Sequence, residues 1–387
     1  MSFAKRTQAI RPFHVMRLLD QAQQLEQAGK NIIHLEVGEP DFTTAPLIIE
    51  AAQQALAQGK TRYTPATGIG ELKQCLANWY QQRYQLAINP NRFIITNGAS
   101  GGLLLLFALL LEENQRIMLA DPGYPCNRHF AELVNAHSQL IPVSASTQYQ
   151  LNAALVEKNW LPNTKAVLLA NPSNPTGTII NNSDLAAICQ SISQKQGELI
   201  ADEIYHGLHY EQPCPSALQY NNEAYVVNSF SKYFGMTGWR LGWIVAPEKA
   251  IETIETLAQN FFLAPPTLSQ YAAIAAFTPQ SQQLFEQQRL ILKERRDYLL
   301  QSLPKLGLKI HCQPQGAFYI YLDISLFNIS SDEFCEQLLV QQGVALTPGD
   351  DFGFNQPERY VRIAYAADIS KLRDAVDRIG RFIESLP

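Results

Sequence analysis

The sequence predicts an α/β fold, with a mainly parallel sheet flanked by helices in a large domain and a smaller α+β domain beside it. Short apolar runs alternate with helical stretches from about residue 93 to residue 246, a pattern typical of parallel sheets that are covered on both faces. Beyond that point long helices predominate and strands become sparse. The chain has 387 residues. A single hydrophobic core rarely supports a chain of this length, so two domains are favoured.

The expected strands of the large domain are short, apolar and separated by helical patterns. They are Phe93–Thr96, Ile117–Ala120, Val167–Ala170, Leu199–Ala201, Ala224–Asn228 and Leu241–Ala246. Ligands bind such sheets at the carboxyl ends of the strands. The residues that follow each strand are therefore the first candidates for chemistry.

The smaller domain is expected to combine helices with a few strands, as an α+β domain. Its expected elements, together with the last helix before it, are Glu248–Phe262, Ser281–Leu303, Ala317–Asp323, Asp332–Gln342, Tyr360–Ala364 and Ile369–Leu386. A helix near the start of the chain, Arg17–Ala28, is expected to pack with this domain. We therefore divide the chain into an N-terminal arm with part of the small domain (1–45), a large ligand-binding domain (46–280) and a small C-terminal domain (281–387).

Composition and charge exclude several classes of partner. The net charge is −5 and both signs are mixed along the chain, so we expect no nucleic-acid partner. The longest apolar run, Leu103–Leu111, is too short to cross a bilayer and predicts a buried helix, without a membrane partner. Six scattered cysteines without a CxxC pair indicate free thiols in a reducing compartment. No apolar run follows Lys5, Arg6 and Arg11, so we expect no secretory signal and a soluble, cytoplasmic protein.

Polar and glycine-rich segments follow several of the strands. The turn Asn97–Gly102 opens the apolar helix, and free N–H groups at a helix start suit a phosphate, although many such turns only connect elements. The segment Asn171–Gly177 also follows a strand, but its prolines and glycine are consistent with a rigid turn that has no chemical role. Asp202 ends a buried strand, where a carboxylate needs a cationic partner unless it caps a helix.

A lysine is the most unusual residue at this edge of the sheet. Lys232 follows an apolar strand among hydroxyls and glycines, and burial would lower its pKa and make its amine nucleophilic. Arg240, close by in sequence, offers a forked, permanently charged ligand for phosphate. A phosphate site, an acid for a ring nitrogen and an amine for an aldehyde together point to pyridoxal 5'-phosphate (PLP), and no metal is expected.

At this point the sequence resembles the class I/II aminotransferases of PLP fold type I, related to aspartate aminotransferase. Asp202 lies 28 residues after Asn174, and Lys232 lies 30 residues after Asp202. The resemblance runs from Gly38-Glu39-Pro40-Asp41 to Val361-Arg362-Ile363, and its strongest stretches are Asn174-Pro175-Thr176-Gly177, Ala201-Asp202-Glu203-Ile204-Tyr205, Ser229-x-Ser231-Lys232 and Gly238-Trp239-Arg240-Leu241-Gly242.

This resemblance implies a catalytic role for three residues. Lys232 would hold the cofactor as a Schiff base and later move the substrate proton, and Asp202 would pair with the ring nitrogen. Tyr205, with Asn174, would donate a hydrogen bond to the phenolic oxygen of the cofactor. Tyr124 would stack on the ring.

The resemblance also assigns the binding of phosphate and substrate. Ala99, Ser100, Ser229 and Arg240 would hold the phosphate. Tyr63 would reach the phosphate of the neighbouring subunit, so a homodimer with shared active sites is expected.

The substrate carboxylate would pair with Arg362, assisted by Asn174 and the backbone N–H of Gly38. The implied reaction is a ping-pong transfer of an amino group between an L-amino acid and a 2-oxo acid. No cation occurs in the apolar stretch Asn260–Pro266, which lies near the pocket in relatives. This absence favours neutral or aromatic substrates over dicarboxylic ones, although other loops and the partner subunit also contribute.

Two alternatives use the same lysine or the same fold. A β-lyase would need the same motifs, and a non-catalytic PLP-binding regulator would need a DNA-binding module, for which the chain has no room before residue 31.

His206 and His209 could suggest a metal site, but no glutamate follows the first histidine, and a helix face is the preferred interpretation. The acidic pair in Gly349–Gly353 is expected to be a solvated turn without a chemical role.

Overall fold

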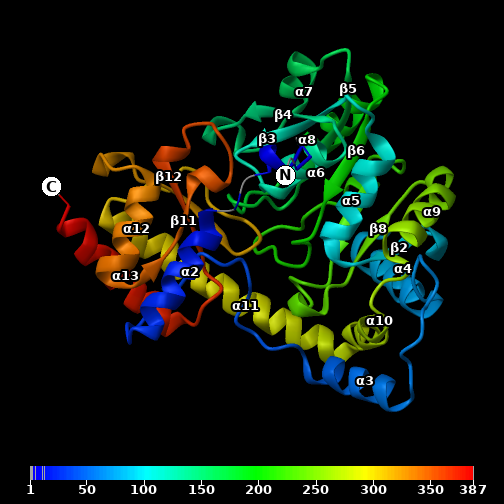
Figure 1. Cartoon of the computed structure of the whole chain (residues 1–387), viewed down its shortest axis with the longest axis horizontal. Coiled ribbons are helices and arrows are strands. Elements are labelled where there is room, and N and C mark those ends of the chain that lie inside the picture. Colours follow the sequence, from blue (N-terminus) through cyan, green and yellow to red (C-terminus); the bar gives the residue numbers. More distant parts are fainter. Residues whose placement is uncertain (1–2, 5, 11, 13, 387) are drawn as a thin grey trace.

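A large twisted sheet with helices on both faces occupies one side of the protein, and a small sheet with its own helices lies beside it (Figure 1). The structure is a computed structural model that describes residues 3–4, 6–10, 12 and 14–386. Lys5 and Arg11, two of the basic residues noted above, lie outside the described residues. Within the described part of the chain, no helix is long and apolar enough to cross a membrane.

The large sheet has seven strands in the order β2-β8-β7-β6-β5-β3-β4. They are β2 (Phe93–Thr96), β3 (Arg116–Asp121), β4 (His137–Pro142), β5 (Thr164–Ala170), β6 (Glu198–Asp202), β7 (Tyr225–Ser229) and β8 (Gly242–Val245). Only β8 runs against its neighbours, which confirms the predicted α/β fold with a mainly parallel sheet. The carboxyl ends of six strands and the amino end of β8 therefore meet at one edge.

Strand β4 is absent from the prediction. It lies at the edge of the sheet, pairs only with β3, and most of its side chains are partly or fully exposed. Its sequence, His-Ser-Gln-Leu-Ile-Pro, is correspondingly mixed in polarity. An edge strand of this kind lacks the continuous apolar run by which its buried neighbours were predicted.

Alternating side chains of the strands fill two separate cores. In β5, Leu168 packs in the core beneath α5 (Gly98–Leu110) and α9 (Ile251–Phe262), whereas its neighbours Val167 and Leu169 point to the opposite face. That opposite face is covered by α4 (Gly70–Tyr84) and α8 (Asn182–Gln194). The remaining helices of this part are α3 (Pro46–Ala57), α6 (Cys126–Leu133), α7 (Ala153–Asn159) and α10 (Thr267–Ile274). Leu103–Leu110 of the apolar run indeed forms most of a buried helix, α5.

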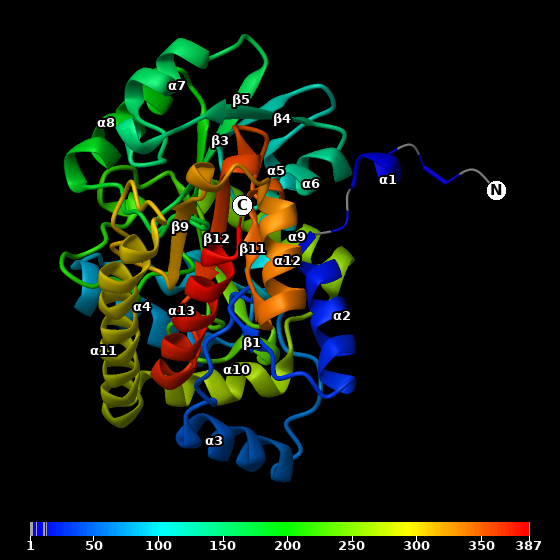
Figure 2. The same cartoon turned by 90° about the vertical axis from the view of Figure 1, so that its left-hand side faces the viewer.

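The small sheet is antiparallel, in the order β11-β12-β9. Its strands are β9 (Tyr319–Asp323), β11 (Thr347–Pro348) and β12 (Tyr360–Ala364), and its helices are α11 (Pro279–Ser302), α12 (Ser331–Gln342) and α13 (Ile369–Glu384). The N-terminal helix α2 (His14–Gln27) packs against α12 and β11 (Figure 2), as expected. A two-stranded parallel pair, β1 (Ile33–His34) with β10 (Val344–Ala345), adds a further connection, and the short α1 (Arg6–Ala9) contacts α6. The domain boundaries at residues 45 and 280 stay predictions.

Candidate active site

A cavity of about 330 Å³ opens at the edge where the strand ends meet. Of the twelve residues predicted for the site, eleven line this cavity: Gly38, Ala99, Ser100, Tyr124, Asn174, Asp202, Tyr205, Ser229, Lys232, Arg240 and Arg362. The twelfth, Tyr63, lies outside it with 83% of its surface exposed. Residues separated by up to 324 positions in sequence, from Gly38 to Arg362, are therefore brought to one place.

One end of the cavity is built to receive an anion. The helix α5 begins at Gly98, so the N–H groups of Ala99 and Ser100 belong to its first turn, where backbone donors lack intrahelical partners. The Arg240 guanidinium lies against the same turn, because a Cβ added to Gly98 would come within 2.6 Å of its Nη2 atom. Ser229 lines the cavity at the end of β7. These groups are suited to bind a phosphate, and we call them the Gly98–Arg240 cradle.

Lys232 lies between this anion site and the small sheet. Its Nζ atom donates a hydrogen bond to the carbonyl oxygen of Gly38 at 2.7 Å. Burial lowers the pKa of Lys232 to about 8, and the nearby guanidinium groups of Arg362 and Arg240 act in the same direction. An amine with this pKa is partly neutral near pH 8, as a nucleophile or a proton acceptor must be.

Asp202 is a buried carboxylate at the end of β6, with 4% of its surface exposed. It accepts a hydrogen bond from the N–H of Ile204 at 3.2 Å, and a turn rather than a helix follows it. Burial nevertheless raises the pKa of Asp202 to about 7. A cation bound in the cavity would lower this pKa again, so the site is matched to a ligand with a protonated nitrogen.

Arg362 is held rigidly at the opposite end of the cavity. Its Nη1 atom donates to Asn174 Oδ1 at 3.0 Å, and its Nη2 atom donates to Thr347 Oγ1 at 3.1 Å and to the carbonyl oxygen of Glu36. The guanidinium lies 4.4 Å from the ring centre of Tyr319 and 4.9 Å from that of Phe352. Its buried Nε atom has no hydrogen-bond partner among the described residues. A guanidinium that is fixed in place and keeps an N–H group without a partner is suited to bind a carboxylate.

The comparisons with known proteins agree with this geometry. The family model described as "Aminotransferase class I and II" matches residues 30–379. A valine–pyruvate aminotransferase of Mycobacterium tuberculosis is 37% identical over 97% of both chains, and a (5-formylfuran-3-yl)methyl phosphate transaminase of Methanocaldococcus jannaschii is 35% identical over 98% of this chain and 99% of its own. The crystal structure of an aminotransferase from M. tuberculosis superimposes with a TM-score of 0.96, at 36% identity and full coverage of both chains.

The chain belongs to the class I and II aminotransferases. Members of this family depend on PLP, and the cavity of this aminotransferase fits that cofactor. The Gly98–Arg240 cradle suits its phosphate, the buried Asp202 suits its ring nitrogen, and the Lys232 amine suits its aldehyde.

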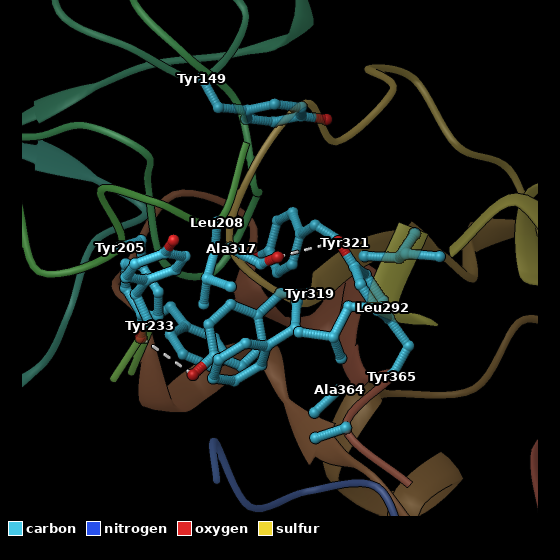
Figure 3. Packing of buried hydrophobic residues seen from close by; sticks show 14 of the residues in the cluster. Tyr149, Tyr205, Leu208, Tyr233, Leu292, Ala317, Tyr319, Tyr321, Ala364 and Tyr365 are labelled. Carbon is cyan, nitrogen blue, oxygen red and sulfur yellow. Dashed lines mark hydrogen bonds between the residues drawn. The ribbon is translucent and has the colours of Figure 1, made fainter. Parts of the chain in front are cut away.

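Tyr319 is a site residue of the aminotransferase that the sequence did not reveal. Its hydroxyl lies 2.9 Å from that of Tyr205 within a cluster of buried aromatic side chains (Figure 3). A Cβ added to Gly38 would lie 2.1 Å from the Tyr319 hydroxyl oxygen, so only glycine fits at position 38. Strand β9 places Tyr319 and Tyr321 in the same local pattern, and no sequence signal distinguishes them.

Further residues that belong to none of the sequence motifs also line the cavity of the aminotransferase. Glu36 and Thr347 lie beside Arg362. Further lining residues come from α2, the N-terminal connection and the loop after β11, and they are Val15, Met16, Leu19, Val37, Asp351 and Phe352. All of these come from segments whose position depends on tertiary packing.

Two expectations are corrected by the structure. His206 and His209 lie in a turn rather than on a helix face, because Gly207 between them has a φ of +102°. His206 Nδ1 lies 2.6 Å from the Tyr84 hydroxyl, and the described residues contain no group of three or more side chains placed to hold a metal.

The acidic pair in Gly349–Gly353 is not solvated as a whole. Asp351 is buried, with 3% of its surface exposed, and its carboxylate accepts hydrogen bonds from two backbone N–H groups of α2. The stretch Asn260–Pro266 does not line the cavity of its own chain, and whether it lies near the cavity of a partner subunit stays a prediction. Two of its residues, Phe261 and Leu263, are instead exposed at the surface.

Proposed function

We propose that this aminotransferase transfers the amino group of neutral, apolar or aromatic L-amino acids to a 2-oxo acid by a ping-pong mechanism. One observation carries the choice of substrate. Among the described residues, the cavity is lined by only three Lys or Arg side chains, Lys232, Arg240 and Arg362, and each already has a proposed partner. A distal carboxylate would find no further cation from this chain. The 37% identical relative is named for valine, a substrate of the proposed class.

In this proposal the large sheet holds and tunes the cofactor. The N–H groups of Ala99 and Ser100, the Ser229 hydroxyl and the Arg240 guanidinium bind its phosphate, and Tyr124 stacks on its ring. When bound, PLP supplies an aldehyde that accepts the amino group and an electron-poor ring that stabilises negative charge. Asp202, once paired with the ring nitrogen, is held in its ionised form and keeps that nitrogen protonated.

Lys232 supplies the covalent attachment and the proton transfer. Its amine would hold the aldehyde of the cofactor, and its Nζ atom, when free, would accept the proton from the α-carbon of the substrate. A pKa of about 8 suits this role, because efficient general bases have pKa values near the working pH. Tyr205, with Asn174, binds the phenolic oxygen of the cofactor.

Arg362 orients the substrate by its α-carboxylate. The guanidinium is already fixed by Asn174, Thr347 and two aromatic rings, so little side-chain entropy is lost when the carboxylate pairs with it. Gly38 lies on the same side and could contribute its backbone N–H. The substrate side chain then extends toward the apolar walls of the cavity.

We also propose that the aminotransferase is a homodimer in which Tyr63 reaches the phosphate site of the partner. The exposed side chain of Tyr63 has no function in its own cavity. The neighbouring segment is bound to this loop through Thr267, which donates to the carbonyl oxygen of Arg62 at 2.9 Å, and the nearby Leu263 is 60% exposed. Light scattering should give twice the chain mass of 43.4 kDa, and Tyr63→Phe should weaken PLP binding. A monomer that retains full cofactor affinity would contradict this part.

The decisive experiment is a spectroscopic half-reaction. The purified protein with PLP is mixed with alanine, valine, phenylalanine or aspartate, and its visible absorption band is followed. Conversion to the shorter-wavelength amine form by apolar amino acids, and recovery on adding a 2-oxo acid, is the expected result. Clear preference for aspartate would overturn the proposed substrate class. A persistent band with accumulating pyruvate and ammonia would show a β-lyase instead, and a protein that binds PLP without any conversion would be a regulator.

A further inference from the structure

The side chain of Asp351 connects two distant segments at the wall of the cavity. Asp351 belongs to the single turn Gly349–Asp351 that follows β11. Its Oδ1 atom accepts a hydrogen bond from the N–H of His14 at 2.6 Å, and its Oδ2 atom accepts one from the N–H of Val15 at 2.8 Å. These are the first two residues of α2, more than 330 positions away in sequence.

The sequence before α2 offers no local cap for these N–H groups. Pro12 and Phe13 precede His14, and neither side chain carries a hydrogen-bond acceptor. The first N–H groups of a helix have no intrahelical partner, and a carboxylate that accepts their hydrogen bonds stabilises the start of the helix. The negative charge of Asp351 at the positive end of α2 adds to this effect. Asp351 therefore replaces the missing local cap.

The loop that carries Asp351 is itself fixed to the large sheet. The N–H of Phe354 donates to Asp121, the last residue of β3, at 3.1 Å, and the carbonyl oxygen of Phe352 accepts the N–H of Gly123 at 2.8 Å. The Asp351 carbonyl oxygen accepts a hydrogen bond from Arg128 Nη2 at 3.2 Å. The position of the Asp351 carboxylate is consequently fixed relative to the large sheet, and α2 is attached to it.

The helix held in this way supplies an apolar wall of the cavity. Val15, Met16 and Leu19 of α2 all line it, whereas Leu18 is buried against the rest of the protein. Met16 is 49% exposed and Val15 and Leu19 are only partly buried, so packing alone holds this edge of the helix weakly. His14 and Arg17 also form ion pairs with Asp332, at 3.3 Å and 3.8 Å, but these pairs are exposed and contribute little. We therefore expect the position of the wall to depend mainly on the hydrogen bonds to Asp351.

We propose that Asp351 is a positioning residue for substrate selection, which holds the start of α2 so that Val15, Met16 and Leu19 contact large apolar side chains. The proposal rests on the proposed function and specifies which amino acids are favoured: those with branched or larger apolar side chains, over alanine. Phe352, the next residue, packs against Arg362, so the same turn supports both the carboxylate site and the side-chain wall.

The test compares Asp351→Ala with the matched control Asp350→Asn in the PLP-loaded enzyme. Asp350 is adjacent, but its carboxylate accepts a hydrogen bond from Ser331 Oγ rather than from α2. For Asp351→Ala we expect kcat/KM for valine to fall about tenfold and that for alanine to change less than about twofold, since apolar contacts contribute roughly this much discrimination. Asp350→Asn should leave the ratio unchanged. Equal losses for both substrates would overturn the proposal.

A double-mutant cycle and an activity-independent measurement complete the test. Met16→Ala should lower the valine-to-alanine ratio by itself and have little further effect in Asp351→Ala, because the wall is already displaced; additive losses would contradict a shared role. Hydrogen exchange of the peptide containing His14 to Leu19 should be faster in Asp351→Ala and unchanged in Asp350→Asn. Unchanged exchange in both variants would reject the attachment, even if the enzyme proved to prefer another substrate class.

Discussion

The two ends of the cavity are built in different ways. The cofactor end is formed by short turns that follow successive strands of one sheet, so Asp202 and Ser229 are placed by the strands that they end. The substrate end is formed where α2, the residues around Gly38 and the small sheet meet, and Arg362 is positioned by contacts with Asn174 and Glu36 from outside its own strand.

This difference separates two kinds of constraint. At the cofactor end, a rigid sheet fixes groups that must act on every substrate in the same way. At the substrate end, side chains from several segments can be exchanged without altering the sheet, and specificity can change while the chemistry is retained. Substitutions at the first end should therefore affect all substrates, and those at the second should affect binding or selection.

The largest effect is expected from Lys232→Ala. Loss of the amine would remove both the proposed attachment of the cofactor and the proposed proton acceptor. The half-reaction with any amino acid should therefore slow by at least about a thousandfold. Stopped-flow absorbance of the PLP-loaded variant measures this rate. Lys249→Ala, at an exposed position, is the control and should behave as wild type. Substantial remaining turnover in Lys232→Ala would contradict the assignment of the site.

Asp202→Asn should reduce the half-reaction about a hundredfold to a thousandfold while PLP still binds. The amide has the same shape but cannot keep the ring nitrogen protonated, and preorganised electrostatic groups typically contribute this much. Absorbance gives both the cofactor content and the rate. The adjacent Glu203→Gln is the matched control, because its carboxylate accepts hydrogen bonds from Ser216 and Ala217 in the core and does not line the cavity. Equal losses in both variants would argue against a specific role for Asp202.

Arg362→Lys should lower kcat/KM about thirtyfold to a hundredfold for every amino acid, mainly through KM. Lysine keeps the charge but loses the forked hydrogen bonds to the carboxylate, which contribute about 1.5–3 kcal/mol each. Steady-state kinetics with two amino acids measures the loss, and the absorption band of bound PLP should stay unchanged. A changed band, or a loss confined to one substrate, would place Arg362 in a different role from the one proposed.

The smallest effect on activity, but a measurable effect on stability, is expected from Glu203→Gln. Burial raises the pKa of Glu203 from 4.5 to about 8, so the folded protein holds a proton that the unfolded chain has lost between these pH values. Its contribution to the free energy of unfolding therefore falls as pH rises from about 4.5 to about 8. In urea unfolding of the cofactor-free protein, wild type should lose roughly 2–4 kcal/mol relative to the variant between pH 5 and pH 8. A pH-independent difference would contradict the raised pKa of this buried carboxyl group.

The same contrast explains what could be predicted from the sequence. Asp202 and Lys232 lie at or just after the ends of apolar strands, and Arg240 lies just before the start of one. Such strands are recognisable because both faces of the sheet are covered. Strand β4 was missed because its exposed edge weakens that pattern. Tyr319 and Glu36 could not be singled out, since their roles arise only where the small sheet meets β1 and the cavity.

The role of Asp351 could not be predicted from the residues around it in sequence. Within the segment Gly349–Gly353 its neighbours suggest a solvated turn, and only the fold shows that its partners are N–H groups at the other end of the chain. For His206 the local conformation itself was predicted wrongly. Gly207 has a positive φ, so His206 lies in a buried turn and not on the expected helix face.

The reversed direction of β8 has a consequence for how this site can change over time. The twelve residues between β7 and β8, 230–241, form the connection of an antiparallel pair, and that connection lies wholly at the active edge. Lys232 and Arg240 therefore occupy one uninterrupted segment whose two ends are held in register by the sheet. Adding or deleting a residue there would displace the amine and the proposed phosphate ligand together, so this segment should keep its length even where other surface loops vary freely.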